Sequence, residues 1–145
     1  MNAATQSASA AGPLHWVRRE IDRALESADQ ALQSCRSDAA AADLARIGDG
    51  RTHLHQVRGA LTVLGLDGVS QFAAALESLL AAIEQRTCPA DEARIALAQR
   101  ALASLRRYLD ELAGGQPDQP LRLLACYREV QAARGEERSS PGDLF

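Results

Sequence analysis

Lysine is absent from this chain of 145 residues, and aromatic side chains account for only 3% of it. All 16 basic residues are therefore arginines, and the net charge is −3. Such a balance argues against nucleic acid as a partner, because phosphate binding requires a concentrated basic face. With so few aromatic residues the core must be aliphatic, and leucine and alanine, which dominate the composition, are strong helix formers. The composition predicts an all-α protein.

Cysteine is also scarce, and its three positions are far apart at Cys35, Cys88 and Cys126. No C-x-x-C pair suggests a metal site, and an odd number of isolated cysteines favours reduced thiols in the cytoplasm. No apolar run reaches the length of a membrane span, and the N-terminus lacks the basic start and apolar region of a signal peptide. We therefore expect a cytoplasmic protein without a metal, a cofactor or a membrane contact.

The N-terminal segment lacks the large apolar side chains that recur in the first predicted helix. Residues 1–12 consist mainly of small and polar residues, so we predict a disordered leader. Pro13 suits the first turn of a helix. From there apolar residues recur at steps of three and four as far as residues 35–37, which is typical of an amphipathic helix.

The second predicted helix is long and contains an interruption. Asp38 is a good N-cap for it, and residues 48–50 (Gly-Asp-Gly) then interrupt the pattern. The apolar seam keeps its phase across this break, so we predict one long bent helix rather than two. The seam consists of Leu44, Ile47, Leu54, Val57, Leu61 and Leu64.

Three further helices complete the predicted bundle, which spans residues 13–134. The third has its apolar face over residues 69–83, and the fourth spans 90–113 and ends at two glycines. Asp118 and Pro120 are the predicted cap and early turn of a fifth. Short connections favour antiparallel neighbours, hence a four-helix bundle with an additional C-terminal helix. Residues 135–145 are predicted to be a linker, cut from a longer protein.

The second helix carries a histidine on its polar side. At 100° per residue His55 points roughly 125° away from the centre of the apolar seam, towards solvent. Arg51, Arg58, Gly59 and Thr62 lie along the same stripe at steps of three and four residues. Glycine in a helix costs about 1 kcal/mol relative to alanine. We interpret Gly59 as leaving room for another protein beside the imidazole, and Arg58 as a cation that can offset a phosphoryl group.

This pattern resembles the signature of the histidine-containing phosphotransfer (HPt) family, over roughly residues 14–112. The matching residues are His55, Arg58, Gly59, Ala60 and Gly65, followed by Leu76 and Glu77 in the next helix. The resemblance implies a phosphorelay module with His55 as phosphoacceptor, Arg58 compensating the phosphoryl charge, and Arg51, Gly59 and Thr62 on the docking face. It implies a receiver domain of a response regulator or a histidine kinase domain as partner. The Mg²⁺ ion would belong to the receiver, and the module would be a phosphocarrier rather than a complete enzyme.

Two segments are also similar to the N-terminal module of hybrid chemosensory histidine kinases of the ChpA/PilL type, which govern type IV pilus twitching motility. They are residues 54–59 (LHQVRG) and residues 128–136 (REVQAARGE). This second resemblance implies a module of a hybrid sensor histidine kinase in a chemotaxis-like two-component system, monomeric when isolated.

Other interpretations of the same residues stay open. The docking face departs from the family at Thr62, where small residues are usual, so a degenerate HPt-like scaffold that docks regulators without phosphotransfer is an alternative. An oligomerisation bundle without signalling chemistry is a third. His53 faces elsewhere on the helix and is interpreted as a packing residue, and the pair with His55 is unsuited to a metal because helix geometry diverges the two rings.

Overall fold

The computed structural model describes residues 2–35, 41–135 and 140–144, which contain helices and no strands. The long helices are α1 (Asn2–Ser34), α2 (Ala41–Val63), α3 (Asp67–Glu84) and α4 (Glu92–Ala113). A short helix η1 (Pro120–Leu123) leads into α5 (Leu124–Ala133), and η2 (Pro141–Leu144) follows. The prediction of an all-α protein is confirmed.

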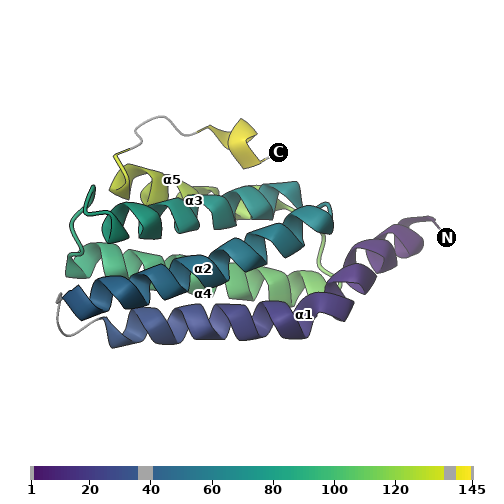
Figure 1. The fold of residues 1–145 in the computed structure, drawn as a ribbon. Coiled ribbons are helices and arrows are strands. Elements are labelled where there is room, and N and C mark those ends of the chain that lie inside the picture. The colour runs from purple at the N-terminus through teal and green to yellow at the C-terminus, as the bar shows by residue number, and fades with distance from the viewer. Residues whose placement is uncertain (1, 36–40, 136–139, 145) are drawn as a thin grey trace.

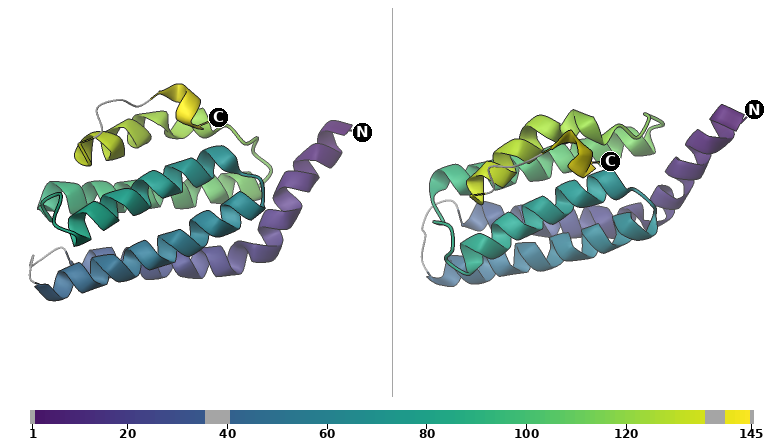
Figure 2. Two further views of the ribbon diagram at one scale, coloured as in Figure 1. Left: turned by 45° about the horizontal axis from the view of Figure 1, so that its top comes forward. Right: turned by 90° about the horizontal axis from the view of Figure 1, so that it is seen from above.

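The four long helices form an antiparallel bundle, as Figures 1 and 2 show from three directions. Helix α2 packs against α1 and α3, and α4 packs against α1 and α3 on the other side. Helix α5 lies across α3 and α4. The predicted four-helix bundle with an additional C-terminal helix is therefore confirmed.

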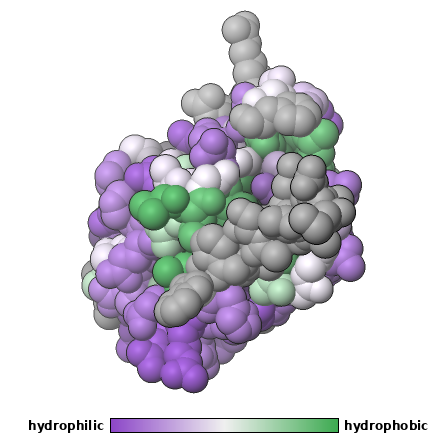
Figure 3. Space-filling view, turned by 90° about the vertical axis from the view of Figure 1, so that its right-hand side faces the viewer, coloured by the Kyte–Doolittle hydropathy of each residue, from purple (hydrophilic) through white to green (hydrophobic). Residues whose placement is uncertain are grey.

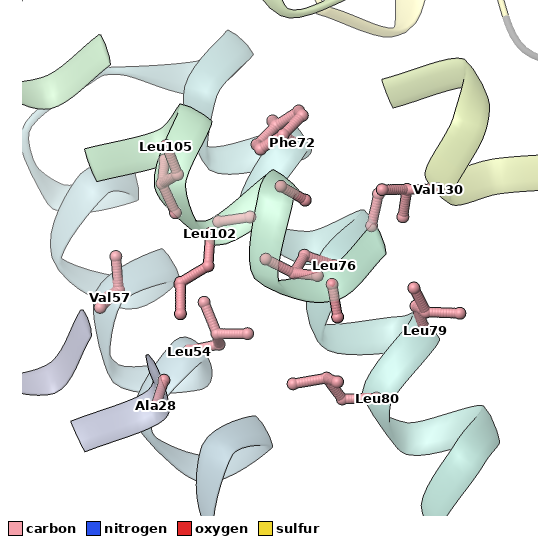
Figure 4. Close-up of a cluster of buried hydrophobic side chains, with 14 of the residues drawn as sticks. Ala28, Leu54, Val57, Phe72, Leu76, Leu79, Leu80, Leu102, Leu105 and Val130 are labelled. Atoms are coloured by element: carbon pink, nitrogen blue, oxygen red, sulfur yellow. The ribbon is translucent and has the colours of Figure 1, made fainter. Parts of the chain in front are cut away.

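The core of the bundle is aliphatic, as the composition predicted. Leucines from α2, α3 and α4 face one another between the helices, and Phe72 of α3 lies at one edge of this cluster (Figure 4). Side chains that are no more than 1% exposed include Ala28, Leu54, Val57, Leu61, Leu76, Leu79, Leu80, Leu102 and Leu105. Burial of this apolar surface supplies the main stabilisation of the bundle.

Helix α2 is continuous from Ala41 to Val63, so the prediction of one helix across residues 48–50 is confirmed. It ends at Val63, two residues before Gly65, whose φ of +76° is readily adopted only by glycine. The amide of Gly65 donates to the Thr62 carbonyl, and that of Leu66 donates to the Leu61 carbonyl, each at 3.0 Å. These two bonds close the helix end and set the direction in which α3 returns.

Several predicted boundaries are wrong. Helix α1 begins at Asn2 instead of Pro13, so residues 2–12, predicted to be disordered, continue the helix beyond the packed bundle (Figure 1). Residues 2–12 are rich in alanine, which has the highest helix propensity. Helix α4 begins at Glu92, capped by the Asp91 side chain, which accepts a hydrogen bond from the Arg94 amide at 2.8 Å. The predicted N-cap Asp38 lies outside the described residues.

The segment after α4 also differs from its prediction. Asp118 does not cap the next helix, because that helix begins after Gln119 without a side-chain cap. Asp118 instead accepts a hydrogen bond from the buried Tyr108 hydroxyl. Within the predicted linker, residues 140–144 are part of the packed structure, since η2 lies against α3 and Leu144 is fully buried. That the chain is cut from a longer protein stays a prediction.

Candidate functional site

His55 lies on the exposed side of α2. Its side chain is 61% exposed, whereas the neighbouring Leu54 and Val57 are buried in the core. The geometric prediction that His55 faces solvent is confirmed. This exposure leaves the imidazole accessible to another molecule.

The imidazole of His55 rests on a carboxylate from the next helix. Nδ1 lies 2.9 Å from Oε1 of Glu77, whose side chain is only 14% exposed. An ionised carboxylate only accepts hydrogen bonds, so we assign the hydrogen to Nδ1, which donates to Glu77. In that tautomer Nε2 carries the lone pair. Glu77 thus fixes the orientation of the ring through Nδ1. Nε2, the nitrogen with the lone pair, is not bonded to Glu77.

Arg58 completes this cluster one turn after His55. Its Nε lies 3.3 Å from Oε2 of Glu77, and its Nη2 lies 3.3 Å from Nδ1 of His55. Because Nδ1 carries a hydrogen, the contact with Nη2 is close approach and not a hydrogen bond. Oε2 of Glu77 is buried and has no aligned hydrogen bond within the described residues, so the ion pair with Arg58 is the contact that balances its charge.

Gly59 and Thr62 occupy the surface beyond the histidine. A Cβ atom added at Gly59 would have no atom within 4 Å, so this position is open. The Thr62 hydroxyl is turned back towards the protein, 2.9 Å from the Arg58 carbonyl oxygen and 2.7 Å from Oγ of Ser70. The hydroxyl that departs from the family pattern is therefore engaged within the domain, although Thr62 itself is exposed.

Arg51 lies one turn before His55 on α2 and is held against α3. Its Nε donates to Oε2 of Glu84 at 3.1 Å and its Nη2 donates to Oε1 at 3.4 Å. The hydrogen bond and the charge of Glu84 raise the pKa of Arg51 above its usual value. The guanidinium thus has an internal partner, and the docking role assigned to Arg51 from the sequence stays a prediction.

Three residues of α3 contact the exposed stripe of α2, a role that the sequence alone does not predict. Glu77 was noted only as a position of the family pattern, and Ser70 and Glu84 were not singled out. All three face α2, and they are spaced by seven residues. This heptad spacing of polar residues beside an apolar helix face is a signal that the sequence does contain.

The remaining candidate residues lie apart from this cluster. His53 is partly buried on α2. Cys88 is buried in the middle of the α3–α4 connection, with its thiol 3.5 Å from the Ala133 carbonyl oxygen. Burial raises the pKa of the Cys126 thiol. Within the described residues no group of three or more His, Cys, Asp or Glu side chains is placed to hold a metal ion. No helix in this part of the chain is long and apolar enough to cross a membrane.

The end of the bundle near the α2–α3 turn presents apolar surface. Figure 3 views this end and shows apolar patches among polar ones. Within the described residues the exposed large hydrophobic side chains are Val63, at the end of α2, and Leu121, in η1, with 87% and 41% of their surfaces exposed. Val63 lies on the same helix as His55, two turns further on.

A four-helix bundle that presents an accessible imidazole, with a carboxylate below it and a guanidinium beside it, is the arrangement expected of a protein that carries a group on histidine. The Hpt domain model matches residues 14–115, which span most of α1 and all of α2 to α4. The chain therefore belongs to the Hpt domain family, and the resemblance inferred from the sequence is confirmed at the level of the family.

A solved structure has the same fold. It is the phosphorylated P1 domain of CheA3 from R. sphaeroides, determined in complex with CheY6. The two are 20% identical with a TM-score of 0.76, and the match covers 88% of this chain and 99% of that one. No curated protein sequence matches the chain.

Proposed function

We propose that this domain is a phosphorelay module in which His55 accepts a phosphoryl group and passes it on. The observation that carries the proposal is the placement of His55, 61% exposed and bonded through Nδ1 to Glu77 at 2.9 Å. This placement leaves Nε2 as the nucleophile. Membership in the Hpt domain family supports the same role.

The chemistry follows from the tautomer. The Nε2 lone pair attacks the phosphorus of an aspartyl phosphate on a receiver domain, the new P–N bond forms, and the bond from phosphorus to the aspartate oxygen breaks. The aspartate leaves as a carboxylate, and the imidazole becomes a cation that keeps its Nδ1 hydrogen. Glu77 accepts a hydrogen bond from that Nδ1–H and keeps its negative charge, which compensates the positive ring and stabilises the phosphorylated state. A histidine kinase domain is the alternative donor.

Arg58 serves the other half of the charge balance. A phosphoryl group on Nε2 would bring negative charge close to a guanidinium that already lies 3.3 Å from the opposite ring nitrogen. Arginine suits this task because it is always charged and forms directional contacts with phosphoryl oxygens. The partner supplies the remaining groups for in-line transfer, including its own Mg²⁺, so this domain is a carrier and not a complete enzyme.

A receiver domain of a response regulator is the partner that we propose. The structural neighbour was crystallised in complex with CheY6, which supports a partner of this kind for the same fold. The open position at Gly59 gives a partner room to approach the imidazole. We further propose a cytoplasmic, chemotaxis-like system that controls type IV pili, supported by the similarity of residues 54–59 and 128–136 to the ChpA/PilL type of kinase.

The test is transfer of label to the domain. We expect an acid-labile phosphoryl group on the wild-type domain after incubation with a phosphorylated receiver domain or a histidine kinase, and none on His55→Gln. His53→Gln is the matched control, because it removes a histidine from the same helix two residues away and should label normally. Absence of label on the wild type across such donors, together with binding of a receiver, would favour the non-catalytic scaffold. Stable self-association through the His55 face would favour the oligomerisation bundle.

A further inference from the structure

The contact between α2 and α3 carries a regular series of polar pairs at its exposed edge. Arg51 pairs with Glu84, His55 and Arg58 pair with Glu77, and Thr62 pairs with Ser70. Successive rungs are seven residues apart on α3, whereas on α2 Arg51 lies four residues before His55 and Thr62 lies seven residues after it. The numbering runs in opposite directions on the two helices, as antiparallel packing requires. We call this series the polar ladder, with Glu84, Glu77 and Ser70 marking its three rungs.

The leucines beneath the ladder cannot alone define where His55 stands relative to Glu77. Hydrophobic burial is non-directional, so a layer of similar aliphatic side chains tolerates small shifts of one helix along another. The hydrogen bond at 2.9 Å between His55 and Glu77 allows only a few tenths of an ångström. Directional polar contacts are the usual means by which packed helices fix their register.

The Thr62–Ser70 rung is tied directly to the middle one. Thr62 has one hydroxyl hydrogen, which it donates to the Arg58 carbonyl at 2.9 Å, so the Ser70 hydroxyl donates to Thr62 at 2.7 Å. Ser70 is only 8% exposed, and its hydroxyl lies 3.4 Å from the same Arg58 carbonyl. A residue of α3 is thereby bound to the backbone of Arg58.

The Arg51–Glu84 rung lies on the other side of His55 and is also closely packed against α2. The carboxylate of Glu84 lies over Gly48, where an added Cβ would stand 2.5 Å from Oε2. Glycine at this position lets the carboxylate approach α2 and take two bonds from Arg51. Along α3 the two outer rungs thus flank Glu77 at one heptad, about 10 Å, on either side.

We propose that Thr62, Ser70, Arg51 and Glu84 are positioning residues that hold Glu77 beneath His55 and so fix the nucleophilic tautomer. The consequence for phosphotransfer rests on the function proposed above. The positioning itself does not, because it exists in the unphosphorylated domain. This separates the failure of one proposal from the failure of the other.

The experiment measures the ¹⁵N chemical shifts of the His55 ring, which report the fraction of the Nδ1–H tautomer. We expect this fraction to fall in Thr62→Val, Ser70→Ala and Arg51→Gln, and transfer rates to fall by about two- to tenfold, the range of one net hydrogen bond. Thr62→Ser keeps the hydroxyl and should restore wild-type shifts. Gly48→Ala is a second variant for the outer rung, since it displaces Glu84 without removing a charge or weakening the helix.

Thr52→Val is the matched control. The Thr52 hydroxyl also bonds to the carbonyl four residues earlier, at 3.0 Å from the Gly48 oxygen, but it forms no rung with α3. It should leave both the shifts and the rates unchanged. A tautomer fraction equal to wild type in Thr62→Val and in Gly48→Ala would overturn the proposal, whatever happens to phosphotransfer. A shift in Thr52→Val as large as in Thr62→Val would also overturn it.

Discussion

At the scale of the single residue, the chemistry that we propose for His55 depends on one largely buried acid, Glu77. Glu77 contributes an oriented hydrogen-bond acceptor at 2.9 Å and a negative charge shared with Arg58. Its burial strengthens both effects, because the local dielectric is lower than in water. His55 is thus distinguished from His53 by the side chain below it and not by its own identity.

Replacing Glu77 tests how much it contributes to the rate of phosphotransfer. In Glu77→Ala we expect the phosphotransfer rate to fall about tenfold or more, the equivalent of losing one hydrogen bond to a charged group, because the imidazolium of the phosphorylated state loses its compensating charge. The measurement is the initial rate of transfer to or from a receiver domain. Glu111→Ala is the control. Glu111 lies on α4, outside the His55 face, and forms an ion pair of 2.8 Å with Arg122. Equal rates for the two variants would contradict the role given to Glu77.

At the scale of the helix, glycines show which faces are packed and which are open. Gly59 lies on an open face of α2, whereas Gly68, in the first turn of α3, is buried. An added Cβ at Gly68 would stand 2.3 Å from the Leu144 carbonyl and 2.3 Å from Cγ of Pro120. The same substitution should therefore have opposite effects at these two positions.

Gly59→Ala should raise the free energy of unfolding by about 0.5–1 kcal/mol, because alanine has the higher helix propensity and meets no atom. Urea denaturation measures this gain. The new methyl group also stands on the proposed docking face, so we expect weaker binding of a receiver domain. Gly50→Ala is the control, since that position faces the core, with Leu80 at 3.7 Å from the added Cβ. Undiminished receiver binding by Gly59→Ala would argue against docking at this face.

Gly68→Ala should lower the free energy of unfolding by about 1–3 kcal/mol, the usual cost of overpacking. Relief of the clash requires η2 or η1 to move away from α3. Urea denaturation and the rate of proteolysis within residues 140–144 measure the two consequences. A variant as stable as wild type with an equally protected C-terminal segment would show that the contact with Leu144 does not hold the segment in place.

At the scale of the whole molecule, two tyrosines secure the segments that follow α4. The Tyr108 hydroxyl donates to Asp118 in the connection before η1, and the Tyr127 hydroxyl donates at 3.0 Å to Asp143 in η2. Burial, followed by the hydrogen bond to the carboxylate, raises the pKa of each tyrosine above its ordinary value. Both anchors therefore depend on a protonated phenol.

The pH dependence follows from the sign of these shifts. Because the pKa of each phenol is higher in the folded than in the unfolded chain, their stabilisation is complete below the unfolded value, about pH 10, and is lost as the pH rises towards the folded values. Absorbance at 295 nm should show less tyrosinate at pH 10 in the native protein than in guanidinium, where both phenols should titrate near pH 10. Thermal unfolding should occur at lower temperature at pH 11 than at pH 8. A native titration near pH 10 would refute the raised pKa values.

The fold class, the helices and the exposed face of the second helix could be predicted from the sequence alone. Its composition specified an all-α fold, the apolar period specified the helices, and the phase of the seam placed His55, Gly59 and Thr62 on one exposed stripe. These are local properties, because helix geometry relates residues three and four apart without reference to the rest of the chain. The ends of the helices were less predictable, as α1 and Asp118 show, because propensity and competing hydrogen bonds decide them.

The tertiary structure alone decided what lies opposite the stripe. Glu77, Ser70 and Glu84 come from a different helix, and their pairing with His55, Thr62 and Arg51 depends on the register of α3 against α2. That register depends on the whole interface, including the polar ladder, and on the turn at Gly65, so it relates residues that are far apart in the sequence. The sequence thus placed a histidine in solvent, and the fold supplied the carboxylate that accepts its Nδ1–H and leaves Nε2 with the lone pair.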